Sequence, residues 1–209
     1  MAVEIKLNTE ATEENIRSEN PDTVIVATGA VPYILPVPGC QQNNVVSPSQ
    51  VLKGEVEVGE RVVIYESTGM QEGPTVADFL AEKGKRVELL THFPSINQHW
   101  GVKSLGNGTH IPIIWGRLKR NGVVITPLTT VKEISGKTIT VADTITGEER
   151  IIEGVDTVVM ATGYRSENRL YKALKGKIKE LHAIGDCKLP RRALDAIHEG
   201  YMTAFRIGT

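Results

Sequence analysis

Residues 22–30 read Asp-Thr-Val-Ile-Val-Ala-Thr-Gly-Ala, and residues 156–164 read Asp-Thr-Val-Val-Met-Ala-Thr-Gly-Tyr. The two stretches share the Asp-Thr-Val start and the Ala-Thr-Gly exit. Their middles are apolar without interruption, as expected of parallel strands that are covered on both faces. We therefore predict that residues 24–27 and 158–161 are strands lying side by side in one sheet, with the chain between them forming a separate lobe.

Each stretch ends in a glycine, which lets the backbone turn sharply or approach a ligand closely. In open α/β sheets, ligands bind at the carboxyl ends of the strands. The two exits are therefore predicted to contact a cofactor. The candidate residues are Ala27, Thr28, Gly29, Thr162 and Gly163.

Between these stretches, strands and helices alternate. Apolar strands are expected at 61–65 and 87–90, with a helix at 73–83 between them. This order predicts a right-handed crossover in a parallel sheet. The other expected elements are a half-exposed strand at 3–8, a surface helix or loop at 9–20, a helix at 111–121, strands at 123–125, 129–134, 138–142, 150–152 and 181–184, and a helix at 191–206.

The pattern predicts an α/β, Rossmann-like fold with a parallel sheet and helices. Three short strands between residues 129 and 152, separated by Ser-Gly and Thr-Gly turns, add a three-stranded antiparallel meander. We expect one discontinuous domain comprising residues 1–54 and 153–209. The inserted domain then comprises residues 55–152.

The turn at 65–73 stands where a G-x-G-x-x-G fingerprint belongs. If Gly73 is its third glycine, Thr68 and Met70 occupy the first two glycine positions, and a side chain at the second keeps the backbone away from a pyrophosphate. One interpretation is a modified nucleotide site that uses Gly69 and Gly73. The other is a βαβ unit that binds nothing tightly. The strand at 87–90 ends without a ribose-binding carboxylate, so NAD versus NADP stays open.

The layout resembles the flavoproteins with two dinucleotide-binding domains. The residues that carry the resemblance are the two Ala-Thr-Gly exits around a βαβ unit and the late Ile184-Gly185-Asp186 segment before a helix. Val62-Val63-Ile64 followed by Pro74-Thr75-Val76-Ala77, and Ile184-Gly185-Asp186 followed by Pro190-Arg191, are similar to the C-terminal region of trimethylamine dehydrogenase, histamine dehydrogenase, bacterial 2,4-dienoyl-CoA reductase and related NADH:flavin oxidoreductases.

The resemblance implies a partial FAD-type domain at 1–54 and 153–209 and an NAD(P)-type domain at 55–152. It implies FAD or ADP as the cofactor, with NAD(P)H as an additional candidate. It also implies a longer parent whose preceding part carries an FMN-bearing TIM barrel, an iron–sulfur cluster and the first Gly-rich unit of the flavin domain. Those N-terminal domains are the expected partners of this chain.

Gly185 and Asp186 are the sharpest chemical signal. The resemblance implies that Asp186 hydrogen-bonds the ribityl hydroxyls of a flavin, and that the helix starting near Arg191 directs its N–H groups at the same cofactor. The alternative, from the residues alone, is that Asp186 caps a turn. Lys188, Arg191 and Arg192 form a basic cluster that meets either a flavin phosphate, a neighbouring domain or solvent.

Composition excludes several classes of function. The net charge of -1 gives no basic excess for nucleic acid. No apolar run is long enough for a membrane span, and the N-terminus lacks a signal-peptide pattern. The two cysteines form no CxxC pair, which suits the cytoplasm and excludes a dithiol reductase centre. His99, Trp100, His110 and Trp115 fit no metal-ligand spacing, and we expect the tryptophans to pack at a domain seam.

These observations favour the C-terminal nucleotide-binding portion of a flavin-dependent oxidoreductase that positions its cofactor for electron transfer. The parent is then an enzyme, the isolated fragment is inactive, and no catalytic side chain is expected here because the cofactor carries the chemistry. The alternative is a non-catalytic structural or ADP-binding module. The substrate and homo-oligomerisation stay open.

Overall fold

The computed structural model describes residues 3–96, 98 and 110–207. The chain divides into two compact units. Unit 1 comprises Met1–Val31 and Tyr164–Thr209, and unit 2 comprises Pro32–Gly163. The sequence-based division placed the boundaries at 54/55 and 152/153. The contacts place 32–54 and 153–163 in unit 2, because strands from both segments join its central sheet.

The core of unit 2 is a five-stranded parallel sheet in the order β3-β10-β4-β5-β6. Its two central strands are covered on both faces, which explains their unbroken apolar sequence. Every residue of β10 is buried, and so are all residues of β4 except the first. The strands are β3 Val45–Val46, β10 Thr157–Ala161, β4 Arg61–Glu66, β5 Arg86–Thr91 and β6 Val124–Thr126.

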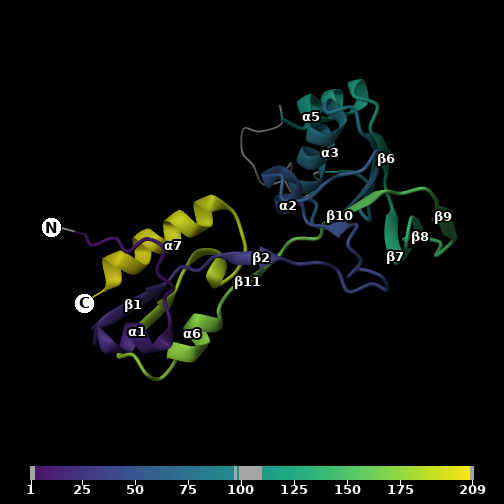
Figure 1. Cartoon of the computed structure of the whole chain (residues 1–209). Coiled ribbons are helices and arrows are strands. Elements are labelled where there is room, and N and C mark those ends of the chain that lie inside the picture. The colour runs from purple at the N-terminus through teal and green to yellow at the C-terminus, as the bar shows by residue number, and fades with distance from the viewer. Residues whose placement is uncertain (1–2, 97, 99–109, 208–209) are drawn as a thin grey trace. The chain divides into compact units, whose positions relative to one another are not determined.

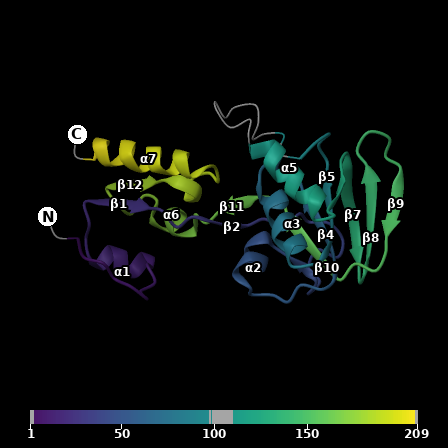
Figure 2. The same cartoon turned by 90° about the horizontal axis from the view of Figure 1, so that it is seen from above.

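Helices cover one face of this sheet and a second sheet covers the other (Figure 2). Alternate residues of β4 point to opposite faces. Val62 and Ile64 pack with the helices, whereas Val63 and Tyr65 pack with the antiparallel sheet β7-β8-β9. The covering elements are α2 Pro48–Lys53, α3 Glu72–Glu82, α5 His110–Arg120, β7 Thr129–Ser135, β8 Thr138–Asp143 and β9 Glu149–Ile152.

Unit 1 is built on two parallel strands, β1, which is labelled in Figure 1, and β12, which is labelled beside β1 in Figure 2. Its small core is formed by Val26, Leu174 and Cys187. A second pair of strands, β2 and β11, forms a two-stranded sheet at the two points where the chain passes between the units. The elements are α1 Glu13–Ser18, β1 Thr23–Val26, β2 Ala30–Pro32, β11 Tyr164–Ser166, α6 Arg169–Leu174, β12 Glu180–Ala183, the 3-10 turn η1 Gly185–Cys187 and α7 Ala193–Arg206.

The expected α/β class, parallel sheet and antiparallel meander are confirmed. The prediction that the twin segments lie side by side in one sheet is wrong. β1 pairs with β12, whereas β10 pairs with β3 and β4 in a different sheet. An apolar strand can be buried in any parallel sheet, so likeness between two strands does not make them neighbours.

The Asp-Thr start of β10 explains its true partner. Asp156 Oδ2 accepts hydrogen bonds from Arg61 N at 2.9 Å and Glu60 N at 3.1 Å. Thr157 Oγ1 accepts from Gly59 N at 3.0 Å. The Lys137 ammonium, 2.8 Å from Asp156, and the hydrogen bonds from Arg61 N and Glu60 N lower the pKa of Asp156 to about 2. The polar residues before the strand therefore fasten it to β4.

The half-exposed strand expected at 3–8 is also absent, because this segment forms no ladder with the described strands. Its apolar residues Val3, Ile5 and Leu7 are exposed rather than half-buried. Alternation indicates a strand only where a sheet edge is available to pair with it. His99 and Trp100 lie outside the described residues, and Trp115 packs against the helix-side core of unit 2.

The central sheet should dominate stability. Replacing Ile64, which is fully buried between β4 and the helices, by alanine leaves a cavity and should lower the free energy of unfolding by about 2–5 kcal/mol. The matched control Val124→Ala, at a side chain with 57% exposure in β6, should change it by less than about 0.5 kcal/mol. Urea unfolding followed by circular dichroism measures both. Equal losses in the two variants would contradict the assignment of the core.

Candidate functional site

The predicted cofactor residues of unit 1 meet at one edge of the β1–β12 sheet. Val26 is in register with Ala183, and Ile184 N donates to Val26 O at 3.1 Å. Because the strands are parallel, residues 27–29 and 184–186 leave the sheet at the same carboxyl edge. Ala27, Thr28, Gly29, Gly185 and Asp186 are thus brought together, in the position where α/β sheets bind ligands.

Gly185 forms the turn that follows β12. Its φ of +61° lies in the left-handed region, and an added Cβ would lie 3.3 Å from the Cβ of Ala196 on α7. Glycine therefore allows η1 to pack closely on α7. Its buried N–H donates to Glu199 Oε2 at 2.8 Å.

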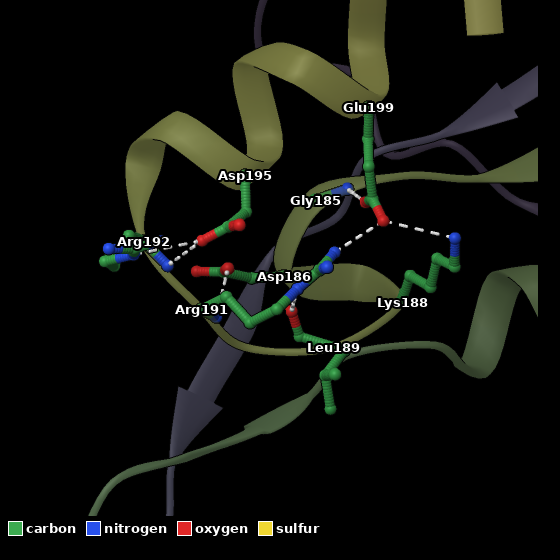
Figure 3. A network of polar contacts seen from close by, with 8 residues as sticks. All are labelled: Gly185, Asp186, Lys188, Leu189, Arg191, Arg192, Asp195 and Glu199. Atoms are coloured by element: carbon green, nitrogen blue, oxygen red, sulfur yellow. Dashed lines mark hydrogen bonds and ion pairs between the residues drawn. The ribbon is translucent and has the colours of Figure 1, made fainter. Parts of the chain in front are cut away.

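Glu199 of α7 is the centre of a charged network that sequence reasoning missed (Figure 3). Its Oε1 accepts from the Arg191 guanidinium at 2.5 Å and from Lys188 Nζ at 3.1 Å. The hydrogen bond from Arg191, reinforced by Lys188 and Gly185, lowers the pKa of Glu199 to about 2. Lys188 and Arg191 of the basic cluster are thus paired internally. The available signal was an acidic residue four positions after Asp195, on the same face of the helix.

Asp186 holds the segment that leads into α7. Its Oδ1 accepts from Arg191 N at 3.1 Å, as expected if Asp186 caps a turn. Arg192 N donates to Asp195 Oδ2 at 3.2 Å in the first turn of α7. The N–H groups of Ala193 and Leu194 are in the first turn of this 14-residue helix, where no acceptor is available within the helix. The helix therefore begins with donors and a positive dipole end beside Asp186.

The first Ala-Thr-Gly exit, in unit 1, is closed by backbone contacts. The Thr28 hydroxyl donates to Glu167 O, and Glu167 N donates to Gly29 O at 3.0 Å. Gly29 has a φ of +76°, so a left-handed turn is required here. Thr28 and Gly29 therefore fix the backbone just after β11.

The second exit, in unit 2, repeats the arrangement. The Thr162 hydroxyl donates to Tyr33 O, and Tyr33 N donates to Gly163 O at 2.8 Å. Each exit is thus hydrogen-bonded to a residue that follows the other exit: Thr28 to Glu167, five positions after Thr162, and Thr162 to Tyr33, five positions after Thr28. The repeated Thr-Gly pair therefore has the same structural role twice. It hydrogen-bonds the neighbouring segment at each of the two places where the chain passes from one unit to the other.

The turn after β4 is organised by Glu66, the last residue of that strand. Glu66 is fully buried. Its Oε1 accepts from Thr68 N and Gly69 N, both at 2.5 Å, and from Thr68 Oγ1 at 2.9 Å. Its Oε2 accepts from Thr91 Oγ1 at 3.0 Å. Four donors from two strand ends therefore surround one carboxylate.

Gly73 makes room for the same side chain. An added Cβ at Gly73 would lie 2.6 Å from Glu66 Cγ and 2.8 Å from Glu66 Cβ. Gly69 is buried with a φ of +68°. At Gly163 an added Cβ would lie 3.4 Å from Thr68 Cγ2, so the exits of β4 and β10 adjoin. Gly69, Gly73, Thr162 and Gly163 thus gather at the carboxyl edge of the unit 2 sheet.

The described residues hold no cluster of three or more metal-ligating side chains. Cys40 and Cys187 are free, and none of the helices in the described ranges is long and apolar enough to cross a membrane.

A sequence profile of the pyridine nucleotide-disulphide oxidoreductases matches residues 3–200. The chain belongs to this family. Its two parallel-sheet units, each with a glycine turn at the carboxyl edge, are the Rossmann-like architecture of FAD- and NAD(P)-binding oxidoreductases.

The curated relatives include reductases and amine dehydrogenases. The chain is 33% identical to the metal reductase of Desulforamulus reducens, over 99% of this chain and 34% of the relative. It is 30% identical to the N,N-dimethylglycine/sarcosine dehydrogenase of Chromohalobacter salexigens, over 95% of this chain and 33% of the relative. The chain therefore spans about a third of the length of the curated relatives it matches.

Solved structures share the fold over nearly the whole chain. A 2-naphthoyl-CoA reductase complex superimposes with a TM-score of 0.83 at 30% identity, over 97% of this chain and 29% of that chain. Histamine dehydrogenase from Rhizobium sp. 4-9 superimposes with a TM-score of 0.86 at 24% identity, over 97% of this chain and 33% of that chain. The latter similarity shows the fold alone.

Within this family member, Gly73 should not tolerate a side chain. Gly73→Ala should lower the free energy of unfolding by about 1–3 kcal/mol, because the new Cβ overlaps the buried stem of Glu66. The matched control is Gly116→Ala in α5, where the Cβ would meet only the mobile Arg120 guanidinium and helix propensity favours alanine. Chemical denaturation measures both. A neutral Gly73→Ala would show that Glu66 is not fixed as described.

The Glu199 network should appear in the pH dependence of stability. Since folding lowers the pKa of Glu199 from 4.5 to about 2, its ionised form stabilises the folded state above pH 4.5, and this contribution is lost as the pH falls from 4.5 towards 2. Glu199→Gln should therefore be less stable at pH 7 and lose less stability on acidification. Unfolding midpoints measured across this range test it, with exposed Glu133→Gln as the control. Parallel curves for wild type and Glu199→Gln would contradict the network.

Proposed function

We propose that unit 1 contributes to binding FAD, or ADP in its place, at the carboxyl edge of β1 and β12. The observation that carries the proposal is the meeting of Ala27–Gly29 with Gly185–Asp186 at one parallel-sheet edge that leads into the start of α7. Asp186 retains a second carboxylate oxygen that can accept a hydrogen bond from a ribityl hydroxyl, and the first-turn N–H groups of α7 suit a phosphate.

The residues would bind and orient the cofactor rather than react. A bound flavin would itself supply the electron transfer. Gly185 keeps the backbone close to α7, and Glu199 fixes Arg191 and Lys188 beside the Gly185 turn. Thr28, Gly29, Thr162 and Gly163 would act by fixing the backbone of the two crossings.

The whole protein is proposed to be a flavin-dependent oxidoreductase of the trimethylamine dehydrogenase, histamine dehydrogenase and 2,4-dienoyl-CoA reductase group, located in the cytoplasm. The support is the match over nearly all of this chain to about a third of longer reductases and dehydrogenases. The remaining length would hold the FMN-bearing barrel, the iron–sulfur cluster and the rest of the FAD-type domain. Unit 2 would then be the NAD(P)-type domain.

A second candidate is a structural or ADP-binding module with no part in the chemistry. The observation that favours it is the turn at 66–73, where Glu66 takes up backbone donors that a nucleotide phosphate would need. The two candidates differ in whether flavin is held and reduced.

The test uses the complete product of the gene, scored for flavin and ADP content and for flavin reduction. Asp186→Asn should lower flavin occupancy at least about tenfold, because a charged hydrogen-bond acceptor is lost. The matched control is Asp143→Asn, whose carboxylate accepts from Ile145 N and Thr146 N in a turn of unit 2, and it should leave occupancy unchanged. Protein that holds neither FAD nor ADP, or equal occupancy in Asp186→Asn and Asp143→Asn, would contradict the proposed site, whereas bound ADP without flavin reduction would favour the structural module.

A further inference from the structure

The buried carboxylate of Glu66 has no charge partner in the part of the chain that the structure describes. Its relative exposure is 0%, and no Lys, Arg or His in the described ranges forms an ion pair with it. Burying an unpaired charge is costly unless hydrogen bonds to its charged form compensate. Thr68 N, Gly69 N, Thr68 Oγ1 and Thr91 Oγ1 provide that compensation.

We propose that Glu66 is a built-in anion that occupies the phosphate position of the unit 2 turn and prevents it from accepting NADH or NADPH. Glu66 would thus be a specificity-determining residue, since it excludes a nucleotide phosphate from the unit 2 turn. The proposal concerns unit 2 alone and is independent of the flavin site proposed for unit 1.

The first argument is geometric. In a dinucleotide-binding βαβ unit, the pyrophosphate accepts hydrogen bonds from N–H groups of the turn between the first strand and the helix. Here the turn between β4 and α3 directs the N–H groups of Thr68 and Gly69 at Glu66 Oε1. Successive N–H groups that converge in this way form an anion-binding concavity. In this chain the Glu66 carboxylate occupies that concavity.

The second argument comes from Gly73. The third glycine of the fingerprint normally allows the helix to pack closely against the strand. In this chain the space over Gly73 is filled by Glu66, whose Cγ would lie 2.6 Å from an added Cβ. Gly73 therefore leaves room both for the close approach of α3 to β4 and for the Glu66 side chain that fills the turn.

The third argument is electrostatic. A pyrophosphate placed at this turn would lie next to a buried negative charge, and like charges at short range in a water-excluded site repel strongly. Moving Glu66 out would remove the acceptor of Gly69 N and of Thr91 Oγ1, and both residues are buried. Reducing equivalents would then not reach the protein from NAD(P)H bound at the unit 2 turn.

The experiment replaces the internal anion by an external one. Glu66→Gly vacates the turn and leaves its donors without an acceptor, so the variant should be less stable than wild type. Added inorganic pyrophosphate should raise its thermal unfolding midpoint, because a ligand that binds only the folded state stabilises it. The wild type and the control Glu88→Gln, a half-buried carboxylate of β5 paired with Arg150 and Thr126, should not respond. This readout works even if the variant is largely unfolded alone.

Nucleotide binding gives the second readout. NADH titration followed by the amide NMR signals of Thr68 and Gly69 should leave these signals unmoved in wild type, and in Glu66→Gly should shift them with affinity at least about tenfold tighter. Wild-type protein whose Gly69 signal titrates with NADH would overturn the proposal. So would a Glu66→Gly variant that neither pyrophosphate nor NADH stabilises, or a Glu88→Gln variant that responds equally.

Discussion

Backbone N–H groups at the ends of parallel strands need acceptors, and the chain supplies them from its own carboxylates. Glu66 accepts from the turn after β4, and Glu199 accepts from Gly185 in the turn after β12. Each is placed by packing around a glycine, Gly73 in one unit and Gly185 in the other. The shape of both glycine turns, and hence what each can bind, depends on these two side chains.

The two carboxylates differ in what they leave available. Glu199 is shared with Arg191 and Lys188, so its charge is balanced, and Asp186 beside it keeps an oxygen for other donors. Glu66 is enclosed by hydroxyl and backbone donors, and the unit 2 turn is satisfied without a ligand. The two turns therefore differ in the acceptors and donors that they leave over: Asp186 has a carboxylate oxygen left, whereas Glu66 takes up the backbone donors of the unit 2 turn.

Local patterns predicted most of the elements but not how they assemble. Strands such as β4 and β10 are readable because continuous apolar runs report burial on both faces. Sequence could not show that β10 lies beside β4, because that choice depends on Asp156 reaching Glu60 and Arg61 from far along the chain. Gly185 and Asp186 were singled out through the family resemblance of the Ile184-Gly185-Asp186 segment rather than by a local pattern. Glu199 was not, since its role depends on the folding of α7 onto the Gly185 turn.

The paired strands β2 and β11 make unit 2 an insertion that can be excised. Adjacent strands lie about 5 Å apart, so the two places where the chain changes unit are neighbours in space. A tight hairpin of a few residues could join Val31 to Tyr164 and connect the two segments of unit 1 in the absence of unit 2. Unit 2 itself, residues 32–163, is one continuous stretch of the sequence. Loss, duplication or exchange of this lobe during evolution would therefore require little remodelling of its host.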